Sequence, residues 1–111
     1  EVFLVEFYHP LCGTCQEFAS TFDSLQKSLG KKLSVARISL EDEAGERMAD
    51  EVGASTEGIP NLRLFYKRAE EKGTAVMAGE DPLPDAATLQ ARIQALLGQT
   101  EGRYRKGSSE E

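Results

Sequence analysis

The apolar positions of the chain fall into four short runs that predict β-strands. The first run, Val2–Tyr8, is almost continuously apolar, which predicts a strand that is covered on both faces and central in a sheet. Leu33–Ser39 predicts a second strand, and Leu62–Tyr66 and Thr74–Ala78 predict two more. The charged stretch Lys67–Gly73 joins the last two strands, so we expect them to form a hairpin.

Three further segments repeat apolar residues at spacings of three and four, which predicts amphipathic helices. The first helix is expected to end at Gly30 and the second, which is acidic, at Gly53. Asp85 caps the third, which is expected to end at Gly98. The residues expected to face the core are Cys15, Phe18, Phe22, Leu25 and Leu29 in the first helix, Ala44, Met48 and Val52 in the second, and Ala86, Leu89, Ile93, Leu96 and Leu97 in the third.

The resulting order, β-α-β-α-β-β-α, predicts an α/β fold with a mixed four-stranded sheet flanked by helices. A right-handed crossover makes the first two strands parallel and adjacent, and the hairpin is expected on the other side of the first strand. That first strand is then central. Its carboxyl end, where open α/β sheets usually carry their chemistry, leads directly into the two cysteines of the chain.

Length and composition predict one compact domain over residues 1–98, followed by a polar tail or linker over 99–111 that is expected to be disordered. The net charge of −6 argues against nucleic acid or an acidic membrane surface as a partner. No apolar run approaches the length of a membrane span, so no membrane contact is expected from this segment. The abrupt start inside a strand suggests a mature or excised segment. A monomer or one domain of a larger chain is expected.

The two cysteines, Cys12 and Cys15, stand three positions apart where the first strand gives way to the first helix. On a first helical turn such thiols can close a disulfide, and the free N–H groups of the helix stabilise the thiolate of Cys12. This arrangement predicts thiol–disulfide exchange. Ordinary core cysteines or half of a zinc site are the alternatives. A metal is not expected, because zinc takes four ligands and His9 is the only other histidine or cysteine.

Two segments resemble a known family. Val5–Cys15 reads VEFYHPLCGTC and resembles the active-site stretch of the thioredoxin superfamily, most of all the catalytic domains of protein disulfide isomerases, whose usual form is VEFYAPWCGHC. Gly58–Phe65 reads GIPNLRLF and is similar to the family's second signature, in which a cis-proline loop enters a strand. The resemblance covers residues 2–98 and implies a thioredoxin-like fold that lacks the family's usual first strand and helix.

The resemblance also implies roles for individual residues. Cys12 would be the exposed nucleophile and Cys15 the buried resolving thiol. Glu6 would shuttle the proton of Cys15, since burial would raise its pKa; a strand residue on a wetter edge is the alternative. Pro60 would follow a cis peptide bond, with a trans proline opening an edge strand as the alternative. The backbone of Ile59 would pair with an extended substrate peptide.

Several positions near the cysteines depart from the family pattern. Leu11, Gly13 and Thr14 are expected to contact substrate, but Leu11 stands where the family commonly has tryptophan. Thr14 replaces the histidine of the isomerases, which should make the disulfide less oxidising. His9 is a candidate to compensate for that missing charge, with a solvated loop histidine as the alternative. Arg37 is a candidate to pair with Glu6 and lower its pKa, with a side chain that snorkels to solvent as the alternative.

The sequence therefore predicts a thiol–disulfide oxidoreductase that acts on protein or peptide thiols and disulfides, most like a disulfide-isomerase domain. No cofactor is expected, because the dithiol itself carries two electrons. A thioredoxin-like reductase, a non-catalytic interaction domain of a larger protein and a cluster-binding dimer remain open. The resemblance favours the endoplasmic reticulum lumen or secretory pathway. The cytoplasm or another organelle stays open, because a redox CxxC occurs in both reducing and oxidising compartments.

Overall fold

The computed structural model describes residues 2–66 and 72–110, with side chains for 2–66 and 72–98. All four predicted strands and the three predicted helices are present, and a short extra helix, α3, was not predicted. Part of the expected hairpin connection, residues 67–71, lies outside the described residues. The elements are β1 Val2–Tyr8, α1 Gly13–Leu29, β2 Ser34–Ser39, α2 Glu43–Val52, α3 Ala54–Glu57, β3 Asn61–Tyr66, β4 Thr74–Ala78 and α4 Ala86–Glu110.

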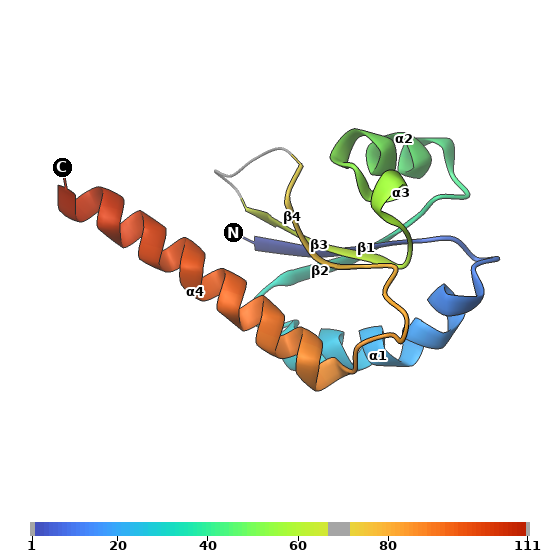
Figure 1. Cartoon of the computed structure of the whole chain (residues 1–111), viewed down its shortest axis with the longest axis horizontal. Coiled ribbons are helices and arrows are strands. Elements are labelled where there is room, and N and C mark those ends of the chain that lie inside the picture. Colours follow the sequence, from blue (N-terminus) through green and yellow to red (C-terminus); the bar gives the residue numbers. More distant parts are fainter. Residues whose placement is uncertain (1, 67–71, 111) are drawn as a thin grey trace.

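The four strands form one mixed sheet in the order β2-β1-β3-β4 (Figure 1). β1 runs parallel to β2 and antiparallel to β3, and β3 pairs antiparallel with β4. The predicted topology, with β1 in the interior of the sheet, is therefore confirmed. Because Phe7 of β1 stands opposite Asn61 of β3, the end of β1 and the start of β3 lie at the same edge of the sheet.

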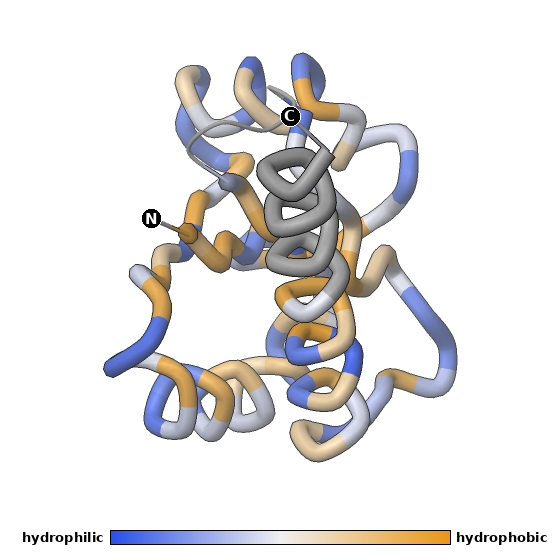
Figure 2. Tube along the Cα trace, turned by 90° about the vertical axis from the view of Figure 1, so that its left-hand side faces the viewer, coloured by the Kyte–Doolittle hydropathy of each residue, from blue (hydrophilic) through white to orange (hydrophobic). Residues whose placement is uncertain are grey.

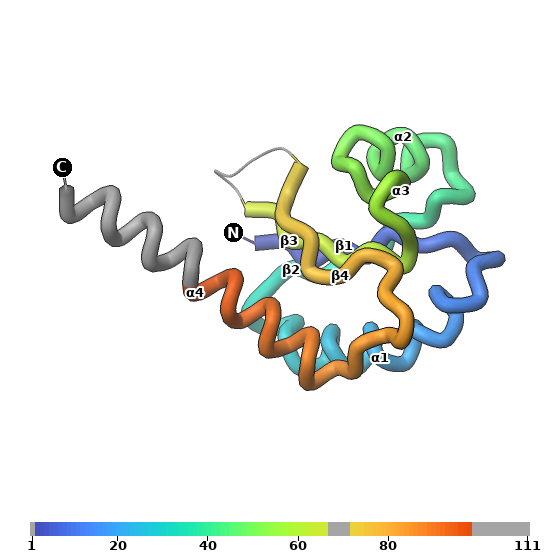
Figure 3. The backbone as a smooth tube through the Cα atoms, in the orientation of Figure 1, coloured from blue at the N-terminus to red at the C-terminus, as the bar shows by residue number. Residues whose placement is uncertain are grey.

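Helices cover both faces of the sheet. α1 and α4 lie on one face and α2 and α3 on the other (Figures 1 and 3). Figure 2 shows apolar positions concentrated in the strands at the centre of the molecule, with polar positions on the outer turns of the helices. This is the α/β layering that the sequence predicts.

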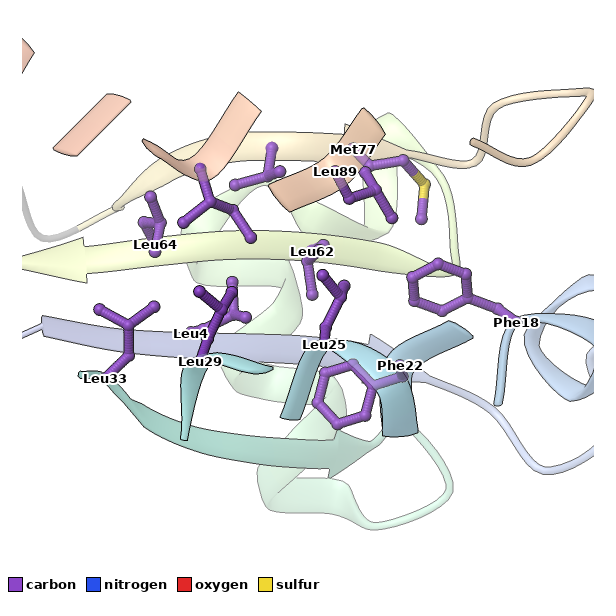
Figure 4. Close-up of a cluster of buried hydrophobic side chains, with 12 residues drawn as sticks. Leu4, Phe18, Phe22, Leu25, Leu29, Leu33, Leu62, Leu64, Met77 and Leu89 are labelled. Carbon is purple, nitrogen blue, oxygen red and sulfur yellow. The ribbon is translucent and has the colours of Figure 1, made fainter. Parts of the chain in front are cut away.

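The larger core lies between the sheet, α1 and α4 (Figure 4). The predicted inward face of α1 is confirmed in full, since its buried residues are Cys15, Phe18, Phe22, Leu25 and Leu29. Each fully buried leucine or phenylalanine stabilises the fold by about 1.5–3 kcal/mol. The strands and α4 contribute Leu4, Leu62, Leu64, Val76, Met77, Leu89 and Ile93. This packing fixes the start of α1, and so the cysteines, against the end of β1.

The smaller core lies on the opposite face, under α2 and α3, and it corrects one prediction. Val52 is buried as expected, and Met48 is partly buried against the same core. Ala44, expected to face inward, is exposed, and Gly45 and Ala49 are buried in its place. The reason is a close approach of the backbone of α2 to the end of β2. A Cβ atom at position 45 would lie only 2.0 Å from the carbonyl oxygen of Ser39. Only glycine allows this contact, which brings Gly45 rather than Ala44 against the sheet.

The expected end of the last helix at Gly98 is wrong, because α4 continues to Glu110. A glycine that ends a helix usually adopts positive φ, as Gly53 does after α2 with φ 91°. Gly98 is not among the glycines with positive φ, so it remains helical. The division into a domain over residues 1–98 and a tail over 99–111 stays a prediction. No described helix is long and apolar enough to cross a membrane.

Candidate active site

Cys12 is the N-cap residue of α1, so its side chain takes the place of the oxygen that usually caps a helix. Its φ and ψ are extended, and its sulfur accepts a hydrogen bond from the backbone N–H of Cys15 at 3.1 Å. The hydroxyl of Thr14 lies 3.3 Å from the same sulfur. A helix N-terminus offers free N–H groups and positive potential, both of which favour a thiolate over a thiol.

The pKa of Cys12 is lowered from its ordinary value. Burial acts to raise it, but the hydrogen bonds that the sulfur makes with Cys15 and Thr14 outweigh burial. Both cysteines are free thiols, and Cys12 is partly exposed. The sulfur is therefore both accessible and shifted towards the nucleophilic thiolate form.

Cys15 has the opposite properties. Its side chain is buried on the inner face of α1, and burial raises its pKa to about 12. The hydrogen bond with Cys12 and the negative charge of Glu6 contribute to this raised pKa, and a hydrogen bond with the backbone of His9 partly counters them. Cys15 therefore keeps its proton at neutral pH, while Cys12 gives up its proton more readily than an ordinary thiol.

Glu6 is fully buried in the middle of β1, on the face of the sheet that packs against α1. Its Oε1 accepts a hydrogen bond from Nε of Arg37 at 2.9 Å, while its Oε2 has no partner among the described residues. Burial raises the pKa of Glu6, and the hydrogen bond and charge of Arg37 only partly counter this. The side chain is not on a wetter edge of the sheet.

Arg37 makes the ion pair with Glu6 that the sequence suggested, from the neighbouring strand β2. Its guanidinium stacks 4.0 Å from the ring centroid of Tyr8 and lies 5.7 Å from that of Phe22. The side chain is still 38% exposed. Arg37 therefore covers the buried carboxyl at the surface of the sheet.

His9 lies in the turn that precedes Cys12. Its Nδ1 accepts a hydrogen bond from the backbone N–H of Leu11 at 3.1 Å, and its carbonyl oxygen accepts one from the N–H of Cys12 at 3.0 Å. Gln16 closes the same turn by donating to the carbonyl oxygen of Pro10 at 2.8 Å. His9 therefore shapes the turn that presents Cys12, and it is not among the causes of the lowered Cys12 pKa.

A second segment, Gly58–Pro60, lies at the same edge of the sheet as the cysteines (Figure 3). The Ile59–Pro60 peptide bond is cis. The carbonyl oxygen of Pro60 accepts a hydrogen bond from the N–H of Gly79 at 3.0 Å, while no backbone partner of Ile59 is found among the described residues. The backbone of Ile59 is therefore available to another chain.

The exposed surface beside the sulfur is formed by three of the predicted substrate-contacting residues, Leu11, Gly13 and Thr14. The side chain of Leu11 is 84% exposed, which is unusual for a large apolar residue. Ile59 is partly buried and Pro60 is buried. The topology thus gathers all the predicted residues at the carboxyl end of β1, except that Glu6 and Arg37 lie deeper along the sheet.

Sequence reasoning missed one polar group next to this segment. Arg63 is 4% exposed and Asn61 is fully buried, and both bind Glu57. A signal was present, since Arg63 is the one charged residue within the apolar run of β3. Among the described side chains, no group of three or more histidine, cysteine or carboxylate residues is arranged to hold a metal ion.

Comparison with known proteins agrees with this geometry. The family model described as Thioredoxin matches residues 1–91. A protein disulfide-isomerase of Arthroderma benhamiae is 31% identical over 75 residues, covering 62% of this chain and 13% of that protein. A chloroplastic M-type thioredoxin of Zea mays is 31% identical over 77 residues, covering 68% of this chain and 42% of that protein. The chain thus spans less than half the length of either relative.

A solved structure gives the same result at the level of the fold. The Trx4 domain of ERdj5 is 26% identical and superposes with a TM-score of 0.63, covering 86% of this chain and 79% of that chain.

Proposed function

Because this chain belongs to the thioredoxin family, we propose that it is a thiol–disulfide oxidoreductase that acts on polypeptide disulfides in the manner of a disulfide-isomerase domain. The observation that carries the proposal is that the pKa values of two neighbouring thiols are shifted in opposite directions. The pKa of Cys12 is lowered at the helix N-terminus, while burial raises that of Cys15 to about 12. Such a pair divides into a nucleophile that ionises more readily than an ordinary thiol and a resolving thiol that keeps its proton until the mixed disulfide has formed.

In the proposed reaction, the Cys12 thiolate attacks one sulfur of a substrate disulfide. The substrate S–S bond breaks, the second substrate sulfur leaves as a thiolate that takes a proton from water, and Cys12 is held in a mixed disulfide. Cys15 then loses its proton and attacks the Cys12 sulfur, which breaks the mixed disulfide and forms the Cys12–Cys15 disulfide. The substrate sulfur that Cys12 first attacked leaves as a thiolate and takes up a proton. Two electrons pass from the dithiol to the substrate, and the reverse sequence oxidises a substrate dithiol. No metal or organic cofactor takes part in this reaction.

Glu6 is proposed as the proton acceptor for Cys15. The charge of Glu6 raises the pKa of Cys15, so the two groups are electrostatically coupled. Burial raises the pKa of Glu6 towards the range in which a carboxyl group exchanges protons near neutral pH. Arg37 is proposed as a modulator, because its ion pair favours the charged form of Glu6.

The proposed substrate is an extended polypeptide beside Cys12. The free backbone of Ile59 would hydrogen-bond to the substrate main chain, with Pro60 at the base of that contact. Leu11, Gly13 and Thr14 would form the opposite wall, with the exposed Leu11 offering apolar contact. We place this activity in the endoplasmic reticulum or secretory pathway on the likeness to a protein disulfide-isomerase, and the chloroplastic relative keeps another organelle as the alternative.

The test is the alkylation rate of each thiol, followed by the reduction potential measured against glutathione. Cys12 should react far faster than Cys15, and below the pH of about 8.5 at which a free thiol ionises. Cys12→Ser and Cys15→Ser are the matched controls that assign each rate. The potential should lie between about −180 mV, as in a disulfide isomerase, and about −270 mV, as in thioredoxin.

Each outcome of these measurements decides one part of the proposal. Equal alkylation rates would remove the catalytic function and favour a non-catalytic binding domain. A potential at or below the thioredoxin value would assign the chain to the reductases. Thr14 favours a reduction potential more negative than that of a disulfide isomerase, because it lacks the positive charge that a histidine would place beside Cys12.

A further inference from the structure

Three polar residues form a cluster on the face of the sheet opposite Glu6, and the proposed reaction does not use them. They are Glu57 at the end of α3, and Asn61 and Arg63 on β3. We call them the Arg63 cluster. They flank the segment Gly58–Pro60 on both sides in the sequence.

Arg63 connects three parts of the chain. Its Nη1 donates to Oε1 of Glu57 at 2.5 Å, its Nε donates to the carbonyl oxygen of Lys72 at 2.9 Å, and its Nη2 lies 3.5 Å from that of Gly73. The side chain of Arg63 is 5% exposed, whereas that of Glu57 is 41% exposed. The guanidinium thus ties the end of α3 to β3 and to the two residues that precede β4.

Asn61 binds the segment Gly58–Pro60 to Glu57. Its Nδ2 donates to Oε1 of Glu57 at 3.3 Å and to the carbonyl oxygen of Gly58 at 3.2 Å. The segment also rests on the residue that follows β4, because Gly58, with φ 113°, packs against Gly79, which binds Pro60 through the backbone. The Gly58 end is therefore fixed by the side chain of Asn61 and the Pro60 end by the backbone of Gly79, while the backbone of Ile59 between them has no backbone partner among the described residues.

Stability alone does not account for this arrangement. Taking an arginine out of water is costly, and a buried ion pair is often no more stabilising than apolar residues of similar volume. The other positions of β3 on both sides of Arg63 are apolar, namely Leu62 and Leu64. What the ion pair does provide is a fixed geometry, because the planar guanidinium accepts only a few arrangements of its partners.

We propose that Glu57, Asn61 and Arg63 are positioning residues that hold the backbone of Ile59 as a rigid edge for an extended polypeptide. The inference rests on the proposed function and deepens it. It assigns the preference for polypeptide disulfides over small disulfides to the Arg63 cluster. A preordered edge binds more tightly because less conformational entropy is lost when the substrate strand is added.

The experiment compares two substrates in the full chain. One is an extended peptide that contains a disulfide, and the other is bis-hydroxyethyl disulfide, which has no peptide group to pair with Ile59. Glu57→Ala and Asn61→Ala should raise KM for the peptide about tenfold, the effect expected from losing one charge-assisted hydrogen bond. The maximal rate with the peptide should change little, and the rate with the small disulfide should change less than twofold.

A backbone-modified peptide makes the test specific. N-methylation of the peptide group that faces Ile59 removes one main-chain hydrogen bond and should weaken binding to the unchanged protein by a similar factor. In Glu57→Ala the same modification should have a much smaller effect, because the two changes act on one interaction and their effects are not additive.

Two controls separate positioning from folding. Glu80 is 38% exposed and pairs with Arg92, so Glu80→Ala removes a similar ion pair outside the Arg63 cluster and should leave both substrates unaffected. Glu57→Gln keeps an acceptor oxygen for Arg63 and Asn61, so it should fold and show a smaller rise in KM. The pKa of Cys12 should be unchanged in every variant, because none of these residues contacts its sulfur.

The outcomes distinguish this inference from the proposed function. An unchanged protein that reacts with neither disulfide overturns the proposed function itself. A protein that reacts with both, but whose Glu57 and Asn61 variants slow both alike or neither, overturns the positioning role and leaves the proposed function standing. Full additivity of Glu57→Ala with N-methylation also overturns the positioning role.

Discussion

The hydroxyl of Thr14 provides a sharp test of what controls the reactivity of Cys12. Its Oγ1 lies 3.3 Å from the Cys12 sulfur. A thiolate has no proton to give, so in the ionised state only the threonine hydroxyl can donate. Thr14→Val keeps the branched shape of the side chain but removes that donor. The variant should therefore raise the pKa of Cys12, while the hydrogen bond from the N–H of Cys15 remains.

The expected size follows from the geometry. A hydrogen bond to a charged group contributes about 1.5–3 kcal/mol, and the exposure of Thr14 and the long contact reduce this to about 1 kcal/mol. At 1.36 kcal/mol per pKa unit, the pKa of Cys12 should rise by about 0.7 units. In Thr14→Val the reduced protein is destabilised by the same amount, about 1 kcal/mol, at any pH at which Cys12 is ionised. The reduction potential should then become about 20 mV more negative, since 30 mV corresponds to about 1.4 kcal/mol.

The assay is the pH dependence of Cys12 alkylation, combined with equilibration against glutathione. Thr21→Val, about two turns further along α1, is the matched control and should change neither quantity. Thr14→His should shift the potential in the opposite direction, towards oxidising, because an imidazolium favours the thiolate. An unchanged pKa in Thr14→Val, or a potential that does not follow the pKa, would refute the electrostatic reasoning.

Three further predictions concern stability and binding. Burial raises the pKa of Glu6, so its contribution to stability is full below the ordinary glutamate pKa and is lost as the pH rises through the raised value. Glu6→Gln should therefore be more stable than the unchanged protein at pH 7, by about 1 kcal/mol, and denaturant titrations should show that this difference disappears in acid. The variant should also resolve mixed disulfides more slowly, which quenched reactions would show. Gly45→Ala should destabilise the fold by more than about 2 kcal/mol, because its Cβ would meet the backbone of Ser39, and an unchanged melting temperature would contradict the close approach. Leu11→Ser should change stability by less than about 0.5 kcal/mol, since the side chain is 84% exposed, yet raise KM for apolar peptides.

The sequence by itself determined the elements that depend on local patterns. The apolar runs specified the strands, and spacings of three and four specified the buried face of α1, because both patterns follow from the geometry of a single element. The order of elements then left few topologies, and the crossover rule selected the observed one. The place of Cys12 at the start of α1 followed from the same local patterns.

Tertiary structure alone decided the features that depend on contacts between distant segments. α2 turned Gly45 inward in place of Ala44 because the end of β2 came within reach of its backbone. The sequence predicted which of the two thiols would be buried, but the effect of the charge of Glu6 on the pKa of Cys15 arises only when α1 packs against β1. Arg63 contacts Glu57 and two carbonyl oxygens because the fold brings α3, β3 and the residues before β4 together. A charged residue in an apolar strand indicates that it must have hydrogen-bonding partners, because an unpaired buried charge is costly. Those partners come from segments that are distant in the sequence, so the sequence alone does not identify them.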